Sequence, residues 1–175
     1  MKSYRTKEAL RHLQGFRITQ NQLIHWAEKR IVVPSIRDAS GYSSYREYAF
    51  RDLVKAAIVS RLLTIGMSLY DVEDFFELWE EDFRDVQKKG YKTIWDALKA
   101  EPDEFQYYCE ITYADKTREP PSDWQTVFDF WPDAADCISR PGRVQLKDQI
   151  LIRSVRIVNI SEIVHILKVR TGDSF

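Results

Sequence analysis

The stretch Thr19–Ala27, TQNQLIHWA, decides the fold. Thr19 and Gln22 have the three-residue spacing of a capping box, in which the Thr hydroxyl and the Gln side chain each satisfy a free backbone N–H at the start of a helix. The apolar residues that follow recur at the interval of one helical face: they are Leu23, Trp26 and Ala27. The stretch therefore predicts a short helix that is apolar on one side and polar on its outer side.

Another short helix is predicted directly before this one. Thr6 is placed to cap a helix over residues 6–13, and Gly15 then breaks the helical pattern. Two short helices joined by a tight turn, the second of them polar on its outer side, are typical of a helix-turn-helix.

A small β-wing is predicted after the second helix. The β-branched run 31–33 ends at Pro34, and a polar, turn-rich loop covers residues 35–41. Three tyrosines then interleave with polar residues: Tyr42, Tyr45 and Tyr48. Two short strands around this loop would form the wing.

Two longer helices are predicted next. Residues 50–65 carry many apolar side chains, and Gly66 stands where a helix ends in the left-handed conformation that glycine adopts without strain. Ser68 and Asp71 have a capping-box-like spacing, and the helix they start is expected to end at Gly90.

The last part of the chain mixes helix and strand. We expect a short helix over 93–99, a strand over 105–113, one or two strands over 144–160 and a helix over 161–170, whereas the aromatic stretch 124–131 fits either. The fold class is therefore α+β and mostly helical.

The domain organisation follows from these elements. We predict an N-terminal winged helix-turn-helix over residues 1–76, acidic linking helices over 77–100, and a small α+β C-terminal domain over 101–175.

The charges are distributed unevenly along the chain, although its net charge is only −1. Residues 1–66 carry a net +7, residues 67–137 a net −12 and residues 138–175 a net +4. A phosphate backbone attracts the first of these segments and repels the second. We therefore expect the front end to meet a polyanion and the acidic middle to face away from it.

A family resemblance appears once the motifs are read in order. Residues 44–53, SYREYAFRDL, are similar to the pattern G-Y-R-x-Y-(S/T)-x-x-D-L, and residues 65–72, IGMSLYDV, to L-G-(F/M)-S-L-x-(E/D)-I. Residues 18–27, ITQNQLIHWA, match V-S-x-R-T-L-R-Y-(Y/W)-E more loosely. Residues 4–76 therefore resemble the DNA-binding domain of the MerR family of transcription regulators.

The chain departs from the family pattern at several positions. Asn21 and Ile24 stand where the family usually has Arg, Ser44 replaces the wing Gly, and Ala49 removes the usual helix cap. The wing loop is also about three residues longer than usual. These departures bear on the target sequence and the affinity, and not on the fold.

The resemblance and the chemistry of the residues together give the candidate DNA-binding set. Amide and imidazole groups can read base edges in the major groove, basic groups can neutralise phosphates, and tyrosines can donate to phosphates or pack beneath the wing. Trp26 and Tyr48 fit a core position better, and His25 fits a solvated surface equally well. The candidates are Thr19, Gln20, Asn21, His25, Lys29, Arg30, Arg37, Tyr42, Tyr45, Arg46 and Tyr48.

Other function classes find no support in the sequence. It contains no P-loop, G-x-G-x-x-G or H-E-x-x-H motif, and Cys109, Cys137 and His165 lack a metal-site spacing. We therefore expect no enzymatic activity, no cofactor and no metal. The chain has no apolar run long enough to span a membrane, and its charged first ten residues do not resemble a signal peptide. We expect a cytoplasmic, nucleoid-associated protein.

The expected partners are double-stranded DNA and a second copy of the chain. Residues 144–170 are apolar enough for a dimer interface, and the aromatic middle forms either an ordinary core or a pocket for a small-molecule effector. Two other hypotheses remain open: an architectural DNA-binding factor of excisionase or partition type, and an interaction module whose acidic middle binds a protein.

Overall fold

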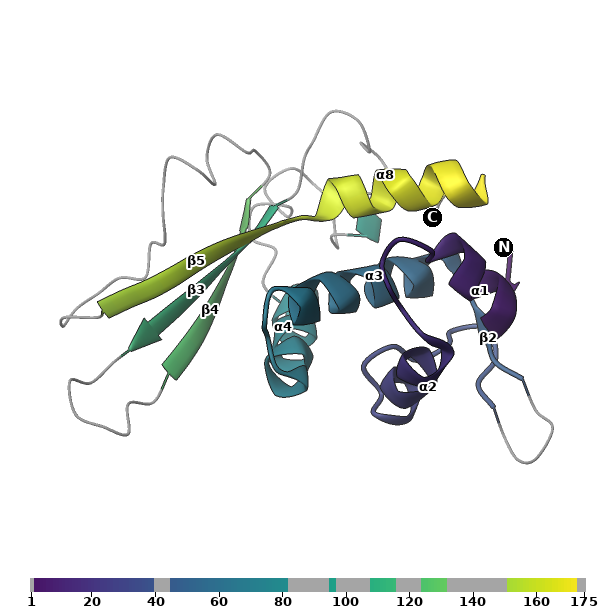
Figure 1. Cartoon of the computed structure of the whole chain (residues 1–175), viewed down its shortest axis with the longest axis horizontal. Helices are drawn as coiled ribbons and strands as arrows, with labels where there is room; N and C mark the ends of the chain where they lie inside the picture. The colour runs from purple at the N-terminus through teal and green to yellow at the C-terminus, as the bar shows by residue number, and fades with distance from the viewer. Residues whose placement is uncertain are drawn as a thin grey trace. The chain divides into compact units, whose positions relative to one another are not determined.

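The structure, a computed structural model, describes residues 2–39, 45–81, 95–96, 108–115, 124–131 and 151–172 (Figure 1). Its elements, in chain order, are β1 (Tyr4–Arg5), α1 (Thr6–His12), α2 (Gln20–Glu28), β2 (Glu47–Tyr48), α3 (Phe50–Thr64), α4 (Leu69–Glu81), β3 (Tyr108–Asp115), β4 (Trp124–Trp131), β5 (Leu151–Asn159) and α8 (Ile160–Thr171). The described part is α+β and mostly helical, which confirms the predicted fold class.

The described residues belong to two compact units. The first contains those of Met1–Phe76 together with those of Glu162–Phe175, and the second contains those of Glu77–Ser161. The sequence alone placed the C-terminal helix in a third, C-terminal part of the chain. In the structure this helix belongs with the helix-turn-helix residues instead.

The helix-turn-helix begins differently from the prediction, at its first helix. Thr6 was expected to cap α1, but the N-cap residue is Arg5, whose side chain makes no capping hydrogen bond. The prediction of the cap was wrong because β1 ends at Arg5 and the chain passes directly from this strand into the helix. In α2 the predicted capping box is present: Thr19 N donates to Gln22 Oε1 at 2.9 Å, and Gln22 N donates to Thr19 Oγ1 at 3.2 Å.

Helix α3 runs through the core of the first unit. Its buried residues lie all around the helix axis, as expected for a helix without a solvent face over most of its length. The Ser60 hydroxyl donates to the carbonyl of Phe16 at 2.5 Å and so connects α3 to the turn between α1 and α2. Gly66, with φ of +92°, follows the helix as predicted, and its N–H donates to Leu63 O.

The wing strand pairs with a segment that the sequence did not single out. β2 lies antiparallel to β1, with Tyr4 opposite Tyr48 and Arg5 opposite Glu47, and Glu47 also forms a β-bridge with Arg37. The run 31–33, expected to be the first wing strand, is not a strand. The reason is local: the N–H groups of residues 31 and 32 both donate to the carbonyl of residue 26 and prolong the last turn of α2.

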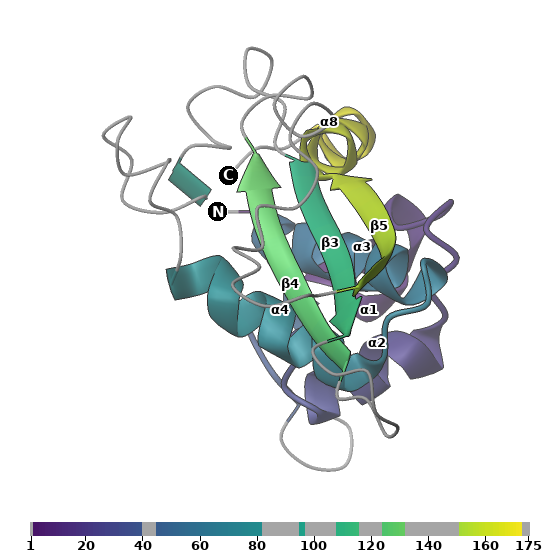
Figure 2. The ribbon, with the colours of Figure 1, turned by 90° about the vertical axis from the view of Figure 1, so that its left-hand side faces the viewer.

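The described strands of the second unit form one antiparallel sheet in the order β4-β3-β5 (Figure 2). The central strand β3 and the strand β5 lie within or close to their predicted ranges, and β4 shows that the ambiguous stretch 124–131 is a strand. The predicted helix over 93–99 is described only at residues 95–96, which are helical, and the end of the helix predicted up to Gly90 lies outside the described residues.

Helix α8 is held to the end of α1 by polar contacts. Arg170 Nη1 donates to the carbonyls of His12, at 3.2 Å, and of Gln14, so a cation satisfies carbonyls at the end of α1. Lys2 Nζ donates to Thr171 O at 2.9 Å. Four apolar residues of α8 are buried: Ile160, Ile163, Val164 and Leu167. No helix within the described ranges is both long enough and apolar enough to cross a membrane.

We predict that truncating the buried face of α8 destabilises the protein. Leu167 is fully buried, whereas Val169, two residues along the same helix, is 71% exposed. Leu167→Ala should lower the free energy of unfolding by about 2–5 kcal/mol, because it removes buried methyl groups and leaves a cavity. Val169→Ala should change it by less than about 0.5 kcal/mol. Urea unfolding compares the two variants, and equal effects would show that α8 does not contribute to the core.

Candidate nucleic-acid interface

The first turns of α2 present the candidate base-reading side chains to solvent. Gln20, Asn21 and His25 are exposed, and Ile24 between them is half-buried. The opposite face of the helix is buried, because Leu23 and the other apolar residues of this stretch point into the core. Burying one face of a capped helix fixes the direction in which the other face points. The predicted amide and imidazole groups therefore share one exposed surface.

Two cations follow at the end of α2, and one of them has a strained backbone. Lys29 and Arg30 are both exposed. Arg30 has φ of +61°, in the left-handed region, where a residue with a Cβ costs about 1–2 kcal/mol relative to the right-handed one. Glycine would relieve this strain but would remove the charge. An arginine kept at such a position is a reason to look for a function of its side chain.

The wing base brings two predicted residues together with one that was not predicted. The Cζ atoms of Arg5 and Arg37 each lie 4.5 Å from the ring centroid of Tyr45, at cation–π distance. Tyr45 is 38% exposed. A role for Arg5 was not predicted from the sequence, because Arg5 lies beside the wing only through its pairing with Glu47, more than forty positions away.

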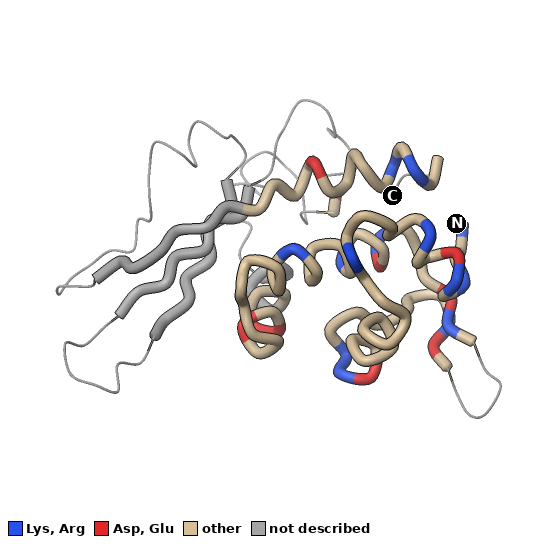
Figure 3. The backbone as a smooth tube through the Cα atoms, viewed as in Figure 1, with Lys and Arg blue, Asp and Glu red and all other residues tan. Residues whose placement is uncertain are grey.

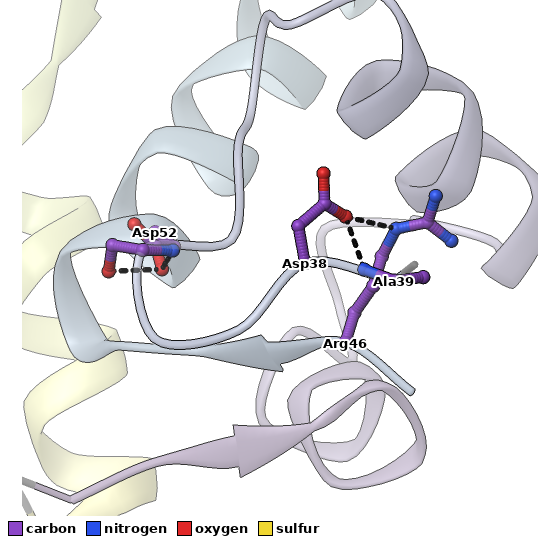
Figure 4. Close-up of polar contacts among 5 residues, drawn as sticks. Asp38, Ala39, Arg46 and Asp52 are labelled. Carbon is purple, nitrogen blue, oxygen red and sulfur yellow. Dashed lines mark hydrogen bonds and ion pairs between the residues drawn. The ribbon is translucent and has the colours of Figure 1, made fainter. Parts of the chain in front are cut away.

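Arg46 is hydrogen-bonded across the wing to Asp38. Its Nε donates to Asp38 Oδ1 at 3.0 Å, and the same oxygen accepts the Ala39 N–H at 2.7 Å (Figure 4). Only 17% of the Arg46 side chain is exposed, and in Figure 4 its two terminal nitrogens point away from Asp38. Tyr42, in the loop between, lies outside the described residues.

One member of the candidate set lies in the core. Tyr48 is fully buried, in agreement with its better fit to a core position. Burial raises the pKa of Tyr48 to about 12, although the nearby Arg46 charge and the Thr6 hydroxyl act in the opposite direction. Tyr48 therefore supports the wing from beneath.

The raised pKa predicts an alkaline loss of stability that depends on Tyr48. In the unfolded chain the phenol ionises near pH 10, whereas in the folded chain it stays neutral until about pH 12. The contribution of the neutral Tyr48 phenol to the free energy of unfolding is thus complete below pH 10. It is lost as the pH rises through 12, by up to about 1.4 kcal/mol per pH unit. Tyr48→Phe lacks this group, so its free energy of unfolding should rise relative to wild type above pH 10. Urea unfolding at pH 8 to 11 tests this, and a difference independent of pH would contradict it.

The carboxylate of Asp52 fixes the position of the wing relative to α3. Asp52 is almost fully buried, and its Oδ2 accepts three hydrogen bonds of 2.8 Å, from Ser35 N, Ser35 Oγ and Ala49 N. The last of these caps the start of α3, so the alanine that replaces the usual capping residue is compensated from within the helix. Figure 4 shows Asp52 at this helix start.

We predict that Asp52→Ala is far more damaging than the equivalent change at Asp71. Asp52→Ala leaves three donors without their acceptor and should lower the free energy of unfolding by at least about 3 kcal/mol. Asp71 also accepts from the N–H and hydroxyl of a serine three residues before it, Ser68, but at a solvent-exposed helix start. Asp71→Ala should therefore cost only about 1 kcal/mol. Thermal and urea unfolding measure both, and similar losses would mean that burial adds nothing at Asp52.

Basic residues lie on several elements of the first unit. Figure 3 shows their positions along the backbone on the N-terminal strand and α1, at the end of α2 and on the wing. Two acidic side chains pair with the arginines already described: Glu47 with Arg5 and Asp38 with Arg46. The described part of the chain holds no group of three or more potential metal ligands. The predicted interface residues offer hydrogen-bond donors and positive charge.

Comparison with known proteins supports a helix-turn-helix regulator. No protein-family model matches the chain. Over 55 residues the chain is 49% identical to uncharacterized HTH-type transcriptional regulators of Mycobacterium bovis and of two strains of Mycobacterium tuberculosis. This stretch is 31% of the chain and 24% of each relative, so the match spans about a quarter of their length. These names describe transcriptional regulators and not enzymes, which is consistent with the expectation of no enzymatic activity. They specify a helix-turn-helix without specifying the MerR type.

Proposed function

We propose that the chain is a sequence-specific, double-stranded DNA-binding transcription regulator of the MerR type. The observation that carries the proposal is the capped helix α2, whose exposed face bears Gln20, Asn21 and His25 beside a wing that carries exposed cations. A helix of this kind places its N-terminal side chains against base edges in the major groove. The relatives named as HTH-type transcriptional regulators support the same function.

The contacts divide into two classes by chemistry. The amides of Gln20 and Asn21 match the paired donor and acceptor of adenine, at about 1–3 kcal/mol of discrimination for a good bidentate pair. Lys29, Arg30 and Arg46 contact phosphates, which adds affinity that depends on salt and not on sequence. Thr19 serves as the cap of α2, and its hydroxyl is already engaged with the Gln22 side chain.

The proposal extends to the assembly and its setting. A homodimer would bind an inverted repeat, because the two-fold axis of the protein is mirrored in its site. The second unit would supply dimerisation, the binding of a small-molecule effector or of a protein, or both. A protein with this role works on the nucleoid in the cytoplasm.

Selection of bound sequences from a random duplex pool tests the function. Wild type should enrich an inverted repeat, and Gln20→Ala or Asn21→Ala should weaken binding and relax the motif at particular positions. Arg46→Ala should weaken binding to all sequences alike. Gln14→Ala removes an equally exposed amide from the turn before α2 and should leave the motif unchanged.

The other outcomes discriminate between the hypotheses. Enrichment of adjacent direct repeats, with several copies bound side by side, would favour the architectural factor. Duplex binding that Arg46→Ala leaves intact would favour the interaction module, in which DNA contact is secondary. A pool that shows no enrichment with wild type would contradict the proposed regulator.

A further inference from the structure

We propose that Arg5, Arg37 and the ring of Tyr45 form a binding cluster for a backbone phosphate of duplex DNA at the base of the wing. The proposal rests on the DNA-binding function above and adds a residue, Arg5, that neither the motif nor the recognition helix supplies. The name wing-base cluster is used below for these three residues.

Strand register brings the cluster together. Arg5 and Arg37 both lie opposite Glu47, one on each side of it, in antiparallel pairing. Residues that oppose each other in antiparallel strands point to the same face, and a residue two positions along a strand returns to that face. Tyr45 stands two positions before Glu47, just outside β2, and its ring lies within cation–π distance of both arginines. Both arginines therefore converge on one ring.

The stacking gives the two arginines a defined geometry. Each guanidinium carbon lies 4.5 Å from the same ring centroid, so the two charges are held within twice that distance of each other. Like charges at this range repel, and the negative face of the aromatic ring offsets part of the repulsion. A phosphate placed between or above them relieves the remainder, because guanidinium groups present planar, paired N–H donors that match its oxygens.

The surroundings of the cluster leave it positively charged and accessible. The Arg5 side chain is 68% exposed, and Glu47 Oε1 lies 3.9 Å from its Nε. One carboxylate beside two guanidinium groups leaves a net positive charge. The fully buried Tyr4 and Tyr48 are paired next to Arg5 and Glu47, so the strand that carries Arg5 rests on the core.

The salt dependence of DNA binding tests the cluster. With the sequence selected from the random pool as a labelled duplex, Arg5→Ala should reduce the slope of log K against log salt concentration by about 0.9, the value for one lost phosphate contact. Arg5→Lys should keep the slope and lose affinity, because the charge remains and the planar donor pair does not. The effect should be the same on a scrambled duplex, since a phosphate carries no sequence information.

Arg61→Ala is the matched control. Arg61 is also exposed and also lies over an aromatic ring, at 5.5 Å from the Phe16 centroid, but it is eleven residues along α3 from the helix start that adjoins the wing. Its removal changes the net charge equally and should leave the slope at the wild-type value. Thermal unfolding of each variant establishes that the fold is intact.

A double-mutant cycle tests whether the ring organises the pair. If the cluster acts as a unit, Tyr45→Leu and Arg5→Ala together should lose little more affinity than either change alone. Additive losses, or a slope for Arg5→Ala equal to that of Arg61→Ala, overturn the cluster while leaving the DNA-binding function standing. Failure of wild type to bind any duplex overturns both proposals.

Discussion

A single buried carboxylate holds both sides of the wing. Asp52 accepts from Ser35, two residues before the wing's bridge at Arg37, and from Ala49, one residue after the returning strand. Ser35 and Ala49 lie on opposite sides of the wing, yet both donate to the same oxygen atom, Asp52 Oδ2. This atom lies inside the core, at the first turn of α3. A buried charge is stable only while its hydrogen bonds are made. The wing cannot shift relative to α3 without breaking these hydrogen bonds. The core therefore fixes the position of the arginines on the wing.

The wing sheet shows how so short a structure keeps its shape. β1 and β2 share only two residue pairs, far fewer than an isolated hairpin needs for stability. Successive side chains of a strand point to opposite faces, so the two residue pairs lie in different surroundings. Tyr4 and Tyr48 point into the core and are fully buried, whereas Arg5 and Glu47 point outward. The inner pair supplies the burial that the ladder lacks, and the outer pair is thereby free to carry charge. The same two residues per strand thus serve both stability and the proposed interface.

Local signals were visible in the sequence, and contacts between distant segments were not. The capping boxes at Thr19 and Ser68 and the glycine after α3 depend on side chains within a few residues, and each is present as predicted. The failures have one cause in common. The run 31–33 has strand-forming residues but prolongs the last turn of α2, and the pairing of β2 with β1, which lies more than forty positions away, could not be identified. Arg5 was missed for the same reason.

The packing position of the C-terminal helix was likewise not predictable from its own sequence. Its sequence predicts a helix, but nothing in it indicates that Arg170 will satisfy the carbonyls after α1 or that it will pass close to Gly15, where a Cβ would lie 3.1 Å from its Nη2. Gly15 has φ of +98°, so both the turn geometry and this close approach favour glycine there. Within the first unit, the hydrogen bonds of Arg170 to the carbonyls of His12 and Gln14 therefore hold α8 on the turn that leads into α2.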